Sequence, residues 1–266
     1  MRTKYNPLAT IIIANYNNEV YLKKCLESVL NQQYKKIEVI VVDDFSSDNS
    51  LNILNEYKNF ITIIKNKKKT KHGSYNQINA YQLGFKKSKG KIIFFLDSDD
   101  YFSKKKITTV INFFRNKNIN IIFDLPIYDF KNKKMKKKFK QKLFIVSSWP
   151  RFSPQSCITL RRSYAKELFK VSKIKKFSTI WFDFRIAIYT FLKFKKITIL
   201  KKYLTYYRQN PNSASTQFKT FSKNWWIRRS EAHDYFSYIS EKFKIKDPLS
   251  IDKLITKFLK YIFYLK

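Results

Sequence analysis

The sequence predicts an α/β domain built on a mostly parallel β-sheet flanked by helices. Two apolar, β-branched runs, ATIIIA at residues 9–14 and IEVIVVD at residues 37–43, are typical of strands buried on both faces, as the strands of parallel sheets are. Between them, apolar side chains recur at helical spacing at Leu22, Cys25, Leu26, Val29 and Leu30. A strand, a helix and a second strand in this order form the βαβ unit of a parallel sheet.

The same alternation continues to residue 124. Cap residues open SSDNSLNILNEY, which carries Leu51, Leu54 and Tyr57 on one helical face. A polar segment precedes the apolar run KIIFFLD. The elements expected here are a helix at 46–57, a strand at 60–64, a strand at 91–97, a helix at 104–117 and a strand at 119–124.

The second half of the chain is richer in aromatic residues and less regular. We expect a loop and a strand in SSWPRFSPQSCITLRR, and a loop that enters a helix in STIWFDFRIAIYTFLKF. No Gly, Ser and Pro-rich linker separates the two halves, so the second half is predicted to elaborate the same sheet rather than form an independent domain. Trp149 and Trp181 could stack on a sugar ring, although packing in the core is the favoured interpretation for either.

The composition is strongly basic. The chain has 266 residues, with 55 Lys and Arg against 19 Asp and Glu, a formal net charge of +36. Such a surface favours anionic partners such as nucleic acid, phospholipid headgroups or phosphorylated substrates. A coding sequence rich in A and T would produce the same skew, because Lys, Asn, Ile, Phe and Tyr are all abundant while Gly numbers only 3. The charge alone therefore does not identify the partner.

The two cysteines, Cys25 and Cys157, are too few and too far apart for a disulfide framework or a zinc site, and we expect both in the core. The N-terminal residues lack the pattern of a secretion signal, and no apolar run is long enough to cross a membrane. The sequence therefore predicts a cytoplasmic protein whose membrane contact, if any, is peripheral.

Two basic segments could make such a contact. Residues 131–142 contain eight lysines in twelve positions, for which a solvated loop or hairpin tip is the favoured interpretation. Residues 250–266 form an amphipathic pattern, with Ile251, Leu254, Ile255, Phe258 and Ile262 on one face and lysines off it. Binding of this helix to an anionic inner membrane surface and packing of its apolar face against the domain fit the pattern equally well.

Carboxylates gather at the ends of two predicted strands. Asp43 and Asp44 end the second strand, and Asp97, Asp99 and Asp100 end the fourth. Ligands of open α/β sheets bind beyond the carboxyl ends of the strands. Three carboxylates this close repel one another unless a cation neutralises them, and their hard oxygen ligands suit Mg²⁺ or Mn²⁺. The pattern predicts a metal site that holds a diphosphate, although Asp44 could instead cap the following helix.

The residues that carry these features resemble those of family 2 glycosyltransferases. The likeness lies in ATIIIANYNNEVYLKKCLESVLNQQYKKIEVIVVDDFSSDNS followed by KGKIIFFLDSDD, and it covers roughly the first 115 residues. The resemblance implies the GT-A fold, a Rossmann-like and mostly parallel sheet flanked by helices, here with a C-terminal helical and aromatic elaboration. It divides the chain into a nucleotide-sugar-binding half at 1–124, an acceptor-side half at 125–215 and a C-terminal helical extension at 216–266.

The resemblance also implies roles for individual residues. Ala14, Asn15 and Tyr16 would line the nucleobase pocket, and Asp44 would accept a hydrogen bond from the base. Asp99 would face the ribose and the metal, Asp100 would be the most direct metal ligand, and Asp97 would support them.

The catalytic base of the family lies at the start of a helix in the second half, usually in a Glu-Asp pair. The best match is WFDFR, with Asp183 in the place of the Asp and Phe182 in the place of the Glu. Arg208, in YYRQNPNSAS, is the candidate contact to the diphosphate or the acceptor. One departure concerns the donor side, where Tyr81 and Gln82 stand in the place of a frequent Arg-Asn pair.

The implied function is an inverting, metal-dependent glycosyltransferase with Mn²⁺ or Mg²⁺. Its donor would be a nucleoside diphosphate sugar, with a UDP-sugar as the first expectation, and its acceptor a glycan or lipid-linked molecule in surface polysaccharide or lipopolysaccharide synthesis. The alternatives are a basic nucleic-acid-binding protein, for which no recognisable binding motif appears, and a catalytically inactive glycan-binding member of the family.

Overall fold

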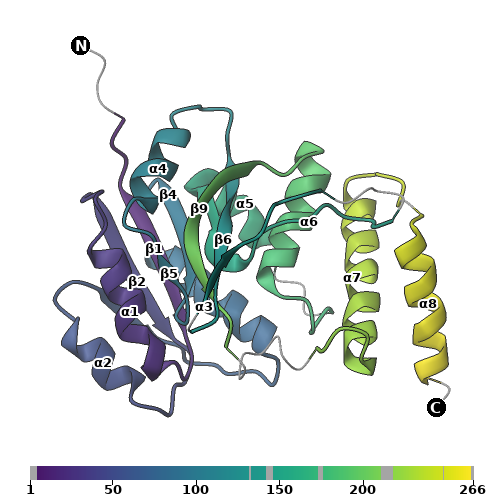
Figure 1. The fold of residues 1–266 in the computed structure, drawn as a ribbon, viewed down its shortest axis with the longest axis horizontal. Helices are drawn as coiled ribbons and strands as arrows, with labels where there is room; N and C mark the ends of the chain where they lie inside the picture. The colour runs from purple at the N-terminus through teal and green to yellow at the C-terminus, as the bar shows by residue number, and fades with distance from the viewer. Residues whose placement is uncertain are drawn as a thin grey trace.

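Figure 1 shows a computed structural model of the chain, which describes residues 5–131, 133–141, 146–172, 176–210, 218–247 and 249–264. A nine-stranded sheet forms its centre. The strands are β1 (Ala9–Asn15), β2 (Ile37–Asp43), β3 (Thr62–Lys65), β4 (Ile92–Asp97), β5 (Tyr101–Phe102), β6 (Ile121–Asp129), β7 (Lys134–Lys136), β8 (Ile158–Arg161) and β9 (Ile199–Arg208). The helices are α1 (Glu19–Leu30), α2 (Ser50–Glu56), α3 (Gly73–Lys87), α4 (Lys106–Phe113), α5 (Arg162–Ser172), α6 (Phe182–Phe194), α7 (Lys223–Lys242) and α8 (Ile251–Tyr264), with a short 3₁₀ helix at Gln155–Cys157.

The sheet is mostly parallel in its first half and mixed in its second. Strands β3, β2, β1 and β4 are parallel neighbours in that order, as the sequence predicts. Strand β8 then runs antiparallel to both β4 and β6, and β6 pairs in parallel with β9. Both halves of the chain therefore share one sheet, and the predicted boundary at residue 124 falls inside β6. The division of the chain by function remains a prediction.

Alternation along the central strands divides the core between the two faces of the sheet. Ile12 of β1 packs with α3, α5, α6 and α7, whereas Ile11 and Ile13 pack with α1, α2 and α4. Gly84 allows α3 to approach β1 closely, because a Cβ atom at this position would lie 2.3 Å from Cγ2 of Ile12. This close packing sets α3 beside the carboxyl ends of β1 and β4.

The two basic segments have different outcomes. The lysine-rich stretch forms a hairpin, because β7 pairs antiparallel with the end of β6 and its three residues are exposed. Residues 132 and 142 of this stretch, and residues 265–266 of the predicted C-terminal helix, lie outside the described residues. Helix α8 is present, and it packs on α7 with its apolar face outward. In the part of the chain that the structure describes, none of the helices has the length and apolar character needed to span a bilayer.

The remaining expectations about the core are mostly met. Cys25 and Cys157 are buried as free thiols, and Trp149 is buried among aromatic side chains. Trp181 is the exception, because it lies in the wall of a large pocket instead of the core.

Candidate functional site

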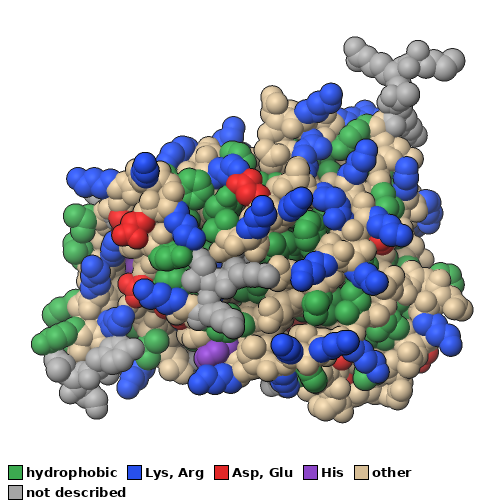
Figure 2. Space-filling model, turned by 180° about the vertical axis from the view of Figure 1, so that it is seen from behind, with side chains coloured by type: hydrophobic (Ala, Val, Ile, Leu, Met, Phe, Trp, Pro, Cys, Tyr) green, Lys and Arg blue, Asp and Glu red, His purple; other side chains and the backbone are tan. Residues whose placement is uncertain are grey.

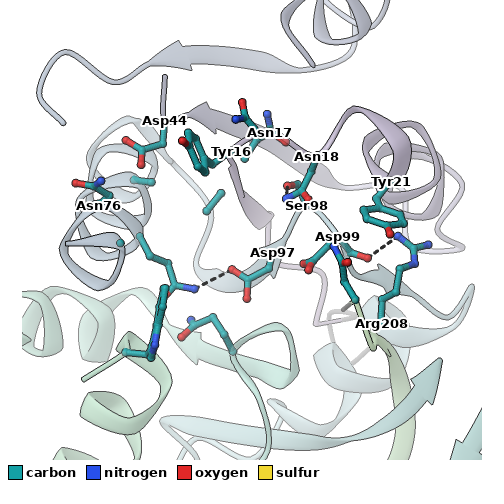
Figure 3. Close-up of a pocket in the computed structure, with 18 of the residues that line it drawn as sticks. Tyr16, Asn17, Asn18, Tyr21, Asp44, Asn76, Asp97, Ser98, Asp99 and Arg208 are labelled. Atoms are coloured by element: carbon teal, nitrogen blue, oxygen red, sulfur yellow. Dashed lines mark hydrogen bonds between the residues drawn. The ribbon is translucent and has the colours of Figure 1, made fainter. Parts of the chain in front are cut away.

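A pocket of about 890 Å³ opens at the carboxyl ends of the parallel strands (Figure 3). Its wall combines the ends of β1, β4 and β9 with α3, the first turn of α6 and one side chain of α7. The sequence-predicted residues that line it are Ala14, Asn15, Tyr16, Asp44, Asp97, Asp99, Asp183 and Arg208. Of the candidate residues, only Asp100 is missing from this wall. Folding therefore brings residues from distant parts of the chain to one cavity.

One end of the pocket is formed after β1 and β2. Asn15 donates to a carboxylate oxygen of Asp43 at 2.9 Å, and Asn66 donates to Asp44 at 2.7 Å. Burial raises the pKa of Asp44, against the opposing effects of the Asn66 hydrogen bond and the Lys69 charge. The Tyr16 ring is 47% exposed and lies beneath the Lys69 ammonium, 4.5 Å from it. An open aromatic face beside a buried carboxylate is suited to a planar, hydrogen-bonding ligand such as a nucleobase.

Asp97 lies in the middle of the pocket, and α3 holds it there. Its Oδ1 accepts hydrogen bonds from Gln77 at 3.0 Å and from the Tyr81 hydroxyl at 2.7 Å. Burial and the neighbouring Asp99 charge raise the pKa of Asp97 to about 7. Tyr81 stands where the glycosyltransferases that the sequence resembles often have Arg. It is fully buried, and its hydroxyl holds the Asp97 carboxylate in place.

Asp99 faces the pocket beside Arg208, as Figure 3 shows. The Arg208 guanidinium donates to the backbone carbonyl of Asp99 at 2.6 Å and stacks over the Tyr21 ring at 4.3 Å. Burial raises the pKa of Asp99, which the Arg208 charge opposes. The arrangement leaves the Asp99 carboxylate and a cation next to each other at the pocket wall.

Asp100 points away from the pocket, which argues against the expectation that it is the most direct metal ligand. It is 1% exposed, and each carboxylate oxygen already accepts a hydrogen bond, one from the Ser156 hydroxyl at 2.6 Å and one from the Arg208 backbone N–H at 2.8 Å. Burial, followed by the charges of Asp99 and Asp97, raises the pKa of Asp100 well above its usual range. Its geometry is that of a residue that joins the metal motif to β9.

The floor beneath Asp100 is a buried polar network. The Lys106 ammonium forms an ion pair with Asp124 at 2.7 Å, and both side chains are fully buried. Lys106 also donates to the Ser156 carbonyl at 2.7 Å, so the ion pair supports the residue that holds Asp100. Buried charges are tolerated when they are paired and hydrogen-bonded in this way.

The pocket residues suit a divalent cation that is shared with a ligand. Within the described residues, no group of three or more His, Cys, Asp and Glu side chains is arranged to hold a metal by itself. Asp97 and Asp99, however, present two carboxylates to one cavity. Mg²⁺-type sites commonly use one or two carboxylates and take their other ligands from phosphate and water. The donor set therefore fits Mn²⁺ or Mg²⁺ bound together with a diphosphate.

Asp183 lines the pocket from the first turn of α6. Its Oδ1 accepts the Phe184 backbone N–H at 2.7 Å, so the side chain caps its own helix while it lines the pocket. Burial raises the pKa of Asp183, whereas the charge of Arg228 on α7 lowers it. A carboxylate with a raised pKa in a ligand pocket has the properties of a general base.

Residues of this site that sequence reasoning missed include Gln77, Ser156 and Arg228. Gln77 and Ser156 position the aspartates, and Arg228 lines the pocket beside Asp183 from a helix in the C-terminal extension. The residues NWWIRRS around it do not indicate which of the two neighbouring arginines, Arg228 or Arg229, would face the pocket. Only the packing of α7 against α6 brings Arg228 to the pocket.

A family model with the description "Glycosyl transferase family 2" matches residues 10–170 of the chain. Among curated proteins, an uncharacterized glycosyltransferase of Nostoc is 29% identical over 75% of this chain and 64% of its own length. The Escherichia coli UDP-Glc:alpha-D-GlcNAc-diphosphoundecaprenol beta-1,3-glucosyltransferase WfaP is 38% identical over 42% of this chain and 43% of its own length. The Staphylococcus aureus poly(ribitol-phosphate) beta-N-acetylglucosaminyltransferase TarP is 26% identical over 88% of this chain and 71% of its own length. The chain thus spans less than two thirds of the first two of these relatives.

Two solved structures show the same fold at low sequence identity. Residues 1–349 of S. aureus TarS, in complex with UDP, superpose with a TM-score of 0.63 at 16% identity, covering 96% of this chain and 70% of that one. The mannosyltransferase PcManGT of Pyrobaculum calidifontis, in complex with GDP-Man and Mn²⁺, superposes with a TM-score of 0.57 at 13% identity. The superposition covers 97% of this chain and 70% of that one. The likeness supports the predicted GT-A architecture.

Proposed function

Since the chain belongs to glycosyl transferase family 2, we propose that it transfers a sugar from a nucleoside diphosphate sugar to an acceptor hydroxyl, with inversion at the anomeric carbon. The observation that carries the proposal is the convergence of Asp44, the Asp97–Asp99 pair and Asp183 on one pocket. They come from the ends of β2 and β4 and from the start of α6, and would serve recognition of a base, binding of a diphosphate and activation of an acceptor.

The donor is proposed to lie along the strand ends. Asn15, Tyr16 and Ala14 would surround the nucleobase, and Asp44 would accept its N–H, as the family resemblance implies. A uridine nucleotide is supported by the name of WfaP and by the complexes of TarS with UDP and UDP-GlcNAc.

Asp97 and Asp99 would hold Mn²⁺ or Mg²⁺ at the diphosphate, with Arg208 beside them. When bound, the ion would stabilise the negative charge that develops on the departing diphosphate. The chain itself contributes the orientation of the two carboxylates, through Gln77 and Tyr81 on one side and Arg208 on the other.

Asp183 is the proposed general base. It would remove the proton of the acceptor hydroxyl as the hydroxyl oxygen bonds to the anomeric carbon and the bond from that carbon to the diphosphate breaks. Inversion requires the base on the face of the sugar opposite the leaving group, and Asp183 would take that place from the start of α6.

The acceptor is proposed to be a surface glycan or a lipid-linked precursor of one, with the reaction in the cytoplasm. The names of WfaP and TarP support this class, because one acts on a diphosphoundecaprenol-linked sugar and the other on poly(ribitol phosphate). The particular sugar and linkage follow from neither name.

A calorimetric screen of UDP, GDP and CDP sugars with Mn²⁺ first identifies the donor. Asp183→Asn is then expected to bind that donor normally and to lower sugar transfer by roughly 10²- to 10⁴-fold, because the amide keeps the capping oxygen but cannot accept the proton. Near-normal transfer by this variant would refute the assignment of the base. Donor binding by the unaltered chain without transfer to any glycan would favour the inactive glycan-binding alternative.

A further inference from the structure

Helix α8 contacts the rest of the protein through a polar face. The Asp252 carboxylate accepts two hydrogen bonds of 2.5 Å from Arg229 of α7 and lies 3.3 Å from Nε2 of His233. Thr256, one turn further on, is fully buried against α7, and Lys260 lies 3.7 Å from Asp234. The side of α8 that packs inward is therefore mainly charged and hydroxylated, with Leu259 half-buried beside Asp252 and Thr256.

The opposite side of α8 is apolar and open to solvent. Its residues are Ile251, Leu254, Ile255, Phe258, Tyr261 and Ile262, each between 36% and 66% exposed. At about 100° per residue these six positions fall within an arc of roughly 120°, here named the outer face of α8. Leu249, just before the helix, is 77% exposed as well. A helix of a soluble domain normally packs such an apolar face against the core, whereas α8 has its apolar face toward the solvent.

Positive charge surrounds the outer face. Lys242, Lys244 and Lys246, at the end of α7 and in the connection to α8, are exposed, and so is Lys257 beside the apolar arc. Among the nearby carboxylates, Asp247 and Asp252 are paired with Lys253 and Arg229. Asp234 lies 3.7 Å from Lys260, and Glu241 is exposed beside Lys242. Figure 2 shows hydrophobic and basic side chains, with a few acidic ones among them, toward the left edge of the molecule, the side on which α8 lies.

We propose that the outer face of α8 binds the headgroup region of an anionic lipid bilayer. A helix of this kind lies in the plane of the interface, with its apolar residues among the upper acyl chains and its lysines at the lipid phosphates. A second copy of this chain fits less well, because it would bring one lysine rim and a net charge of +36 against another. The inference goes beyond sugar transfer, because it concerns where the enzyme is held and not what it catalyses.

Flotation of the full-length chain with vesicles tests the proposal. We expect binding to vesicles that contain phosphatidylglycerol, weakening as salt is added, and much less binding to pure phosphatidylcholine vesicles. The double variant Leu254→Ser, Phe258→Ser should lower the bound fraction at least about tenfold, because it removes two central contacts of the outer face. Phe60→Ser, at a side chain that is 70% exposed on the far part of the fold, is the matched control and should bind as the unaltered chain does.

Two further variants separate the possible outcomes. Asp183→Asn should bind vesicles normally, so that failure of the proposed reaction is distinguished from failure of membrane binding. Lys246→Glu, Lys257→Glu should weaken binding to anionic vesicles at low salt and make little difference at high salt. Absence of anionic-vesicle binding by the unaltered chain, or equal binding by the Leu254→Ser, Phe258→Ser variant, overturns the proposal. The proposal would also be overturned if the unaltered chain were a dimer in solution and the Leu254→Ser, Phe258→Ser variant were a monomer. A second copy of the chain would then cover the outer face of α8.

Discussion

Asp99 and Asp100 are neighbours in the chain but occupy different environments. The Asp99 carboxylate faces the pocket, whereas both oxygens of Asp100 are held by Ser156 and the Arg208 backbone. A short turn after β4 reverses direction between them, and the Asp100 N–H donates to the Asp97 carbonyl at 3.0 Å within that turn. Of the two adjacent carboxylates, only that of Asp99 therefore lines the pocket, and its role as a ligand-binding residue is a prediction.

This difference predicts opposite phenotypes. Asp99→Ala should remove most of the Mn²⁺-dependent part of nucleotide affinity and leave the thermal midpoint nearly unchanged, because its carboxylate faces the pocket and does not join two elements. Asp100→Ala should lower the free energy of unfolding by about 1–3 kcal/mol, because it leaves the Ser156 hydroxyl and the Arg208 N–H without their acceptor. Calorimetry with and without Mn²⁺, together with thermal unfolding, measures both. A stable Asp100→Ala variant that had lost all Mn²⁺ dependence would restore Asp100 as the metal ligand.

Arg228 is expected to set the pH range of the reaction. Its charge lowers the pKa of Asp183, against burial, which raises it. Arg228→Met should therefore raise the pKa of Asp183 further. A general base works only as the carboxylate, so the acidic limb of the pH–rate profile should move to higher pH. The profile of transfer rate against pH measures the shift, with Arg229→Met as the neighbouring control. An unchanged acidic limb would mean that Arg228 does not act on the base.

At the scale of elements, α7 joins the catalytic domain to α8. Its apolar face, with Tyr235, Phe236 and Ile239, is buried in the core shared with α6. Arg229, at the edge of this face, forms the ion pair with Asp252 of α8. Helix α7 is thus part of the core, while α8 depends on a small number of polar contacts.

Loss of the Asp252 contact should release α8 alone. Asp252→Ala is expected to speed amide exchange in residues 251–264 at least about tenfold. Exchange in β1 and β4 should stay unchanged, because loss of the ion pair with Arg229 does not destabilise the core. Hydrogen exchange read by mass spectrometry measures this. Asp234→Ala, which removes the longer Lys260 pair, is the control. Faster exchange throughout the sheet would show that α8 is part of the cooperative core.

Acid should weaken the same contact. Burial alone would raise the pKa of Asp252, but hydrogen bonds from His233 and Arg229 and their charges prevail and lower it below its ordinary value of 3.8. The contribution of a carboxylate with a lowered pKa is fully present above its unfolded pKa and is lost as pH falls through its folded pKa. The attachment of α8 should therefore be constant above about pH 5 and weaken below 3.8.

At the scale of the whole molecule, the net charge of +36 is the dominant feature. Lysine and arginine side chains cover the face seen in Figure 2, with few acidic ones among them. Like charges at this density repel one another in the compact state. The protein should accordingly gain stability when salt screens its surface.

The expected result is a thermal midpoint that rises by a few degrees between about 0.02 M and about 0.3 M NaCl, as the Debye length shortens from roughly 20 Å to roughly 6 Å. Scanning fluorimetry in matched buffers measures it. A midpoint that falls with salt would instead mean that ion pairs such as Lys193–Glu167 stabilise the fold more than repulsion destabilises it.

The α/β alternation, and the edge of the sheet at which the pocket opens, could be predicted from the sequence. Strand and helix periodicities are local properties, so β1, α1, β2 and β4 could be predicted from runs such as ATIIIA and IEVIVVD. Parallel strands present their carboxyl ends at one edge, so the order of the strands was enough to assign Asp44 and Asp97 to one pocket. The family resemblance added Asp183, which lies in the same pocket.

Only the tertiary structure decided which of these residues reach the ligand space. The inward turn of Asp100 depends on Ser156, 56 residues away, and the approach of Arg228 to Asp183 depends on the packing of α7. The direction of α8 was equally open, because its pattern fits an apolar face turned inward or outward. The ion pair of Asp252 with Arg229 selects the outward arrangement, and such contacts between distant residues leave no trace in local spacing.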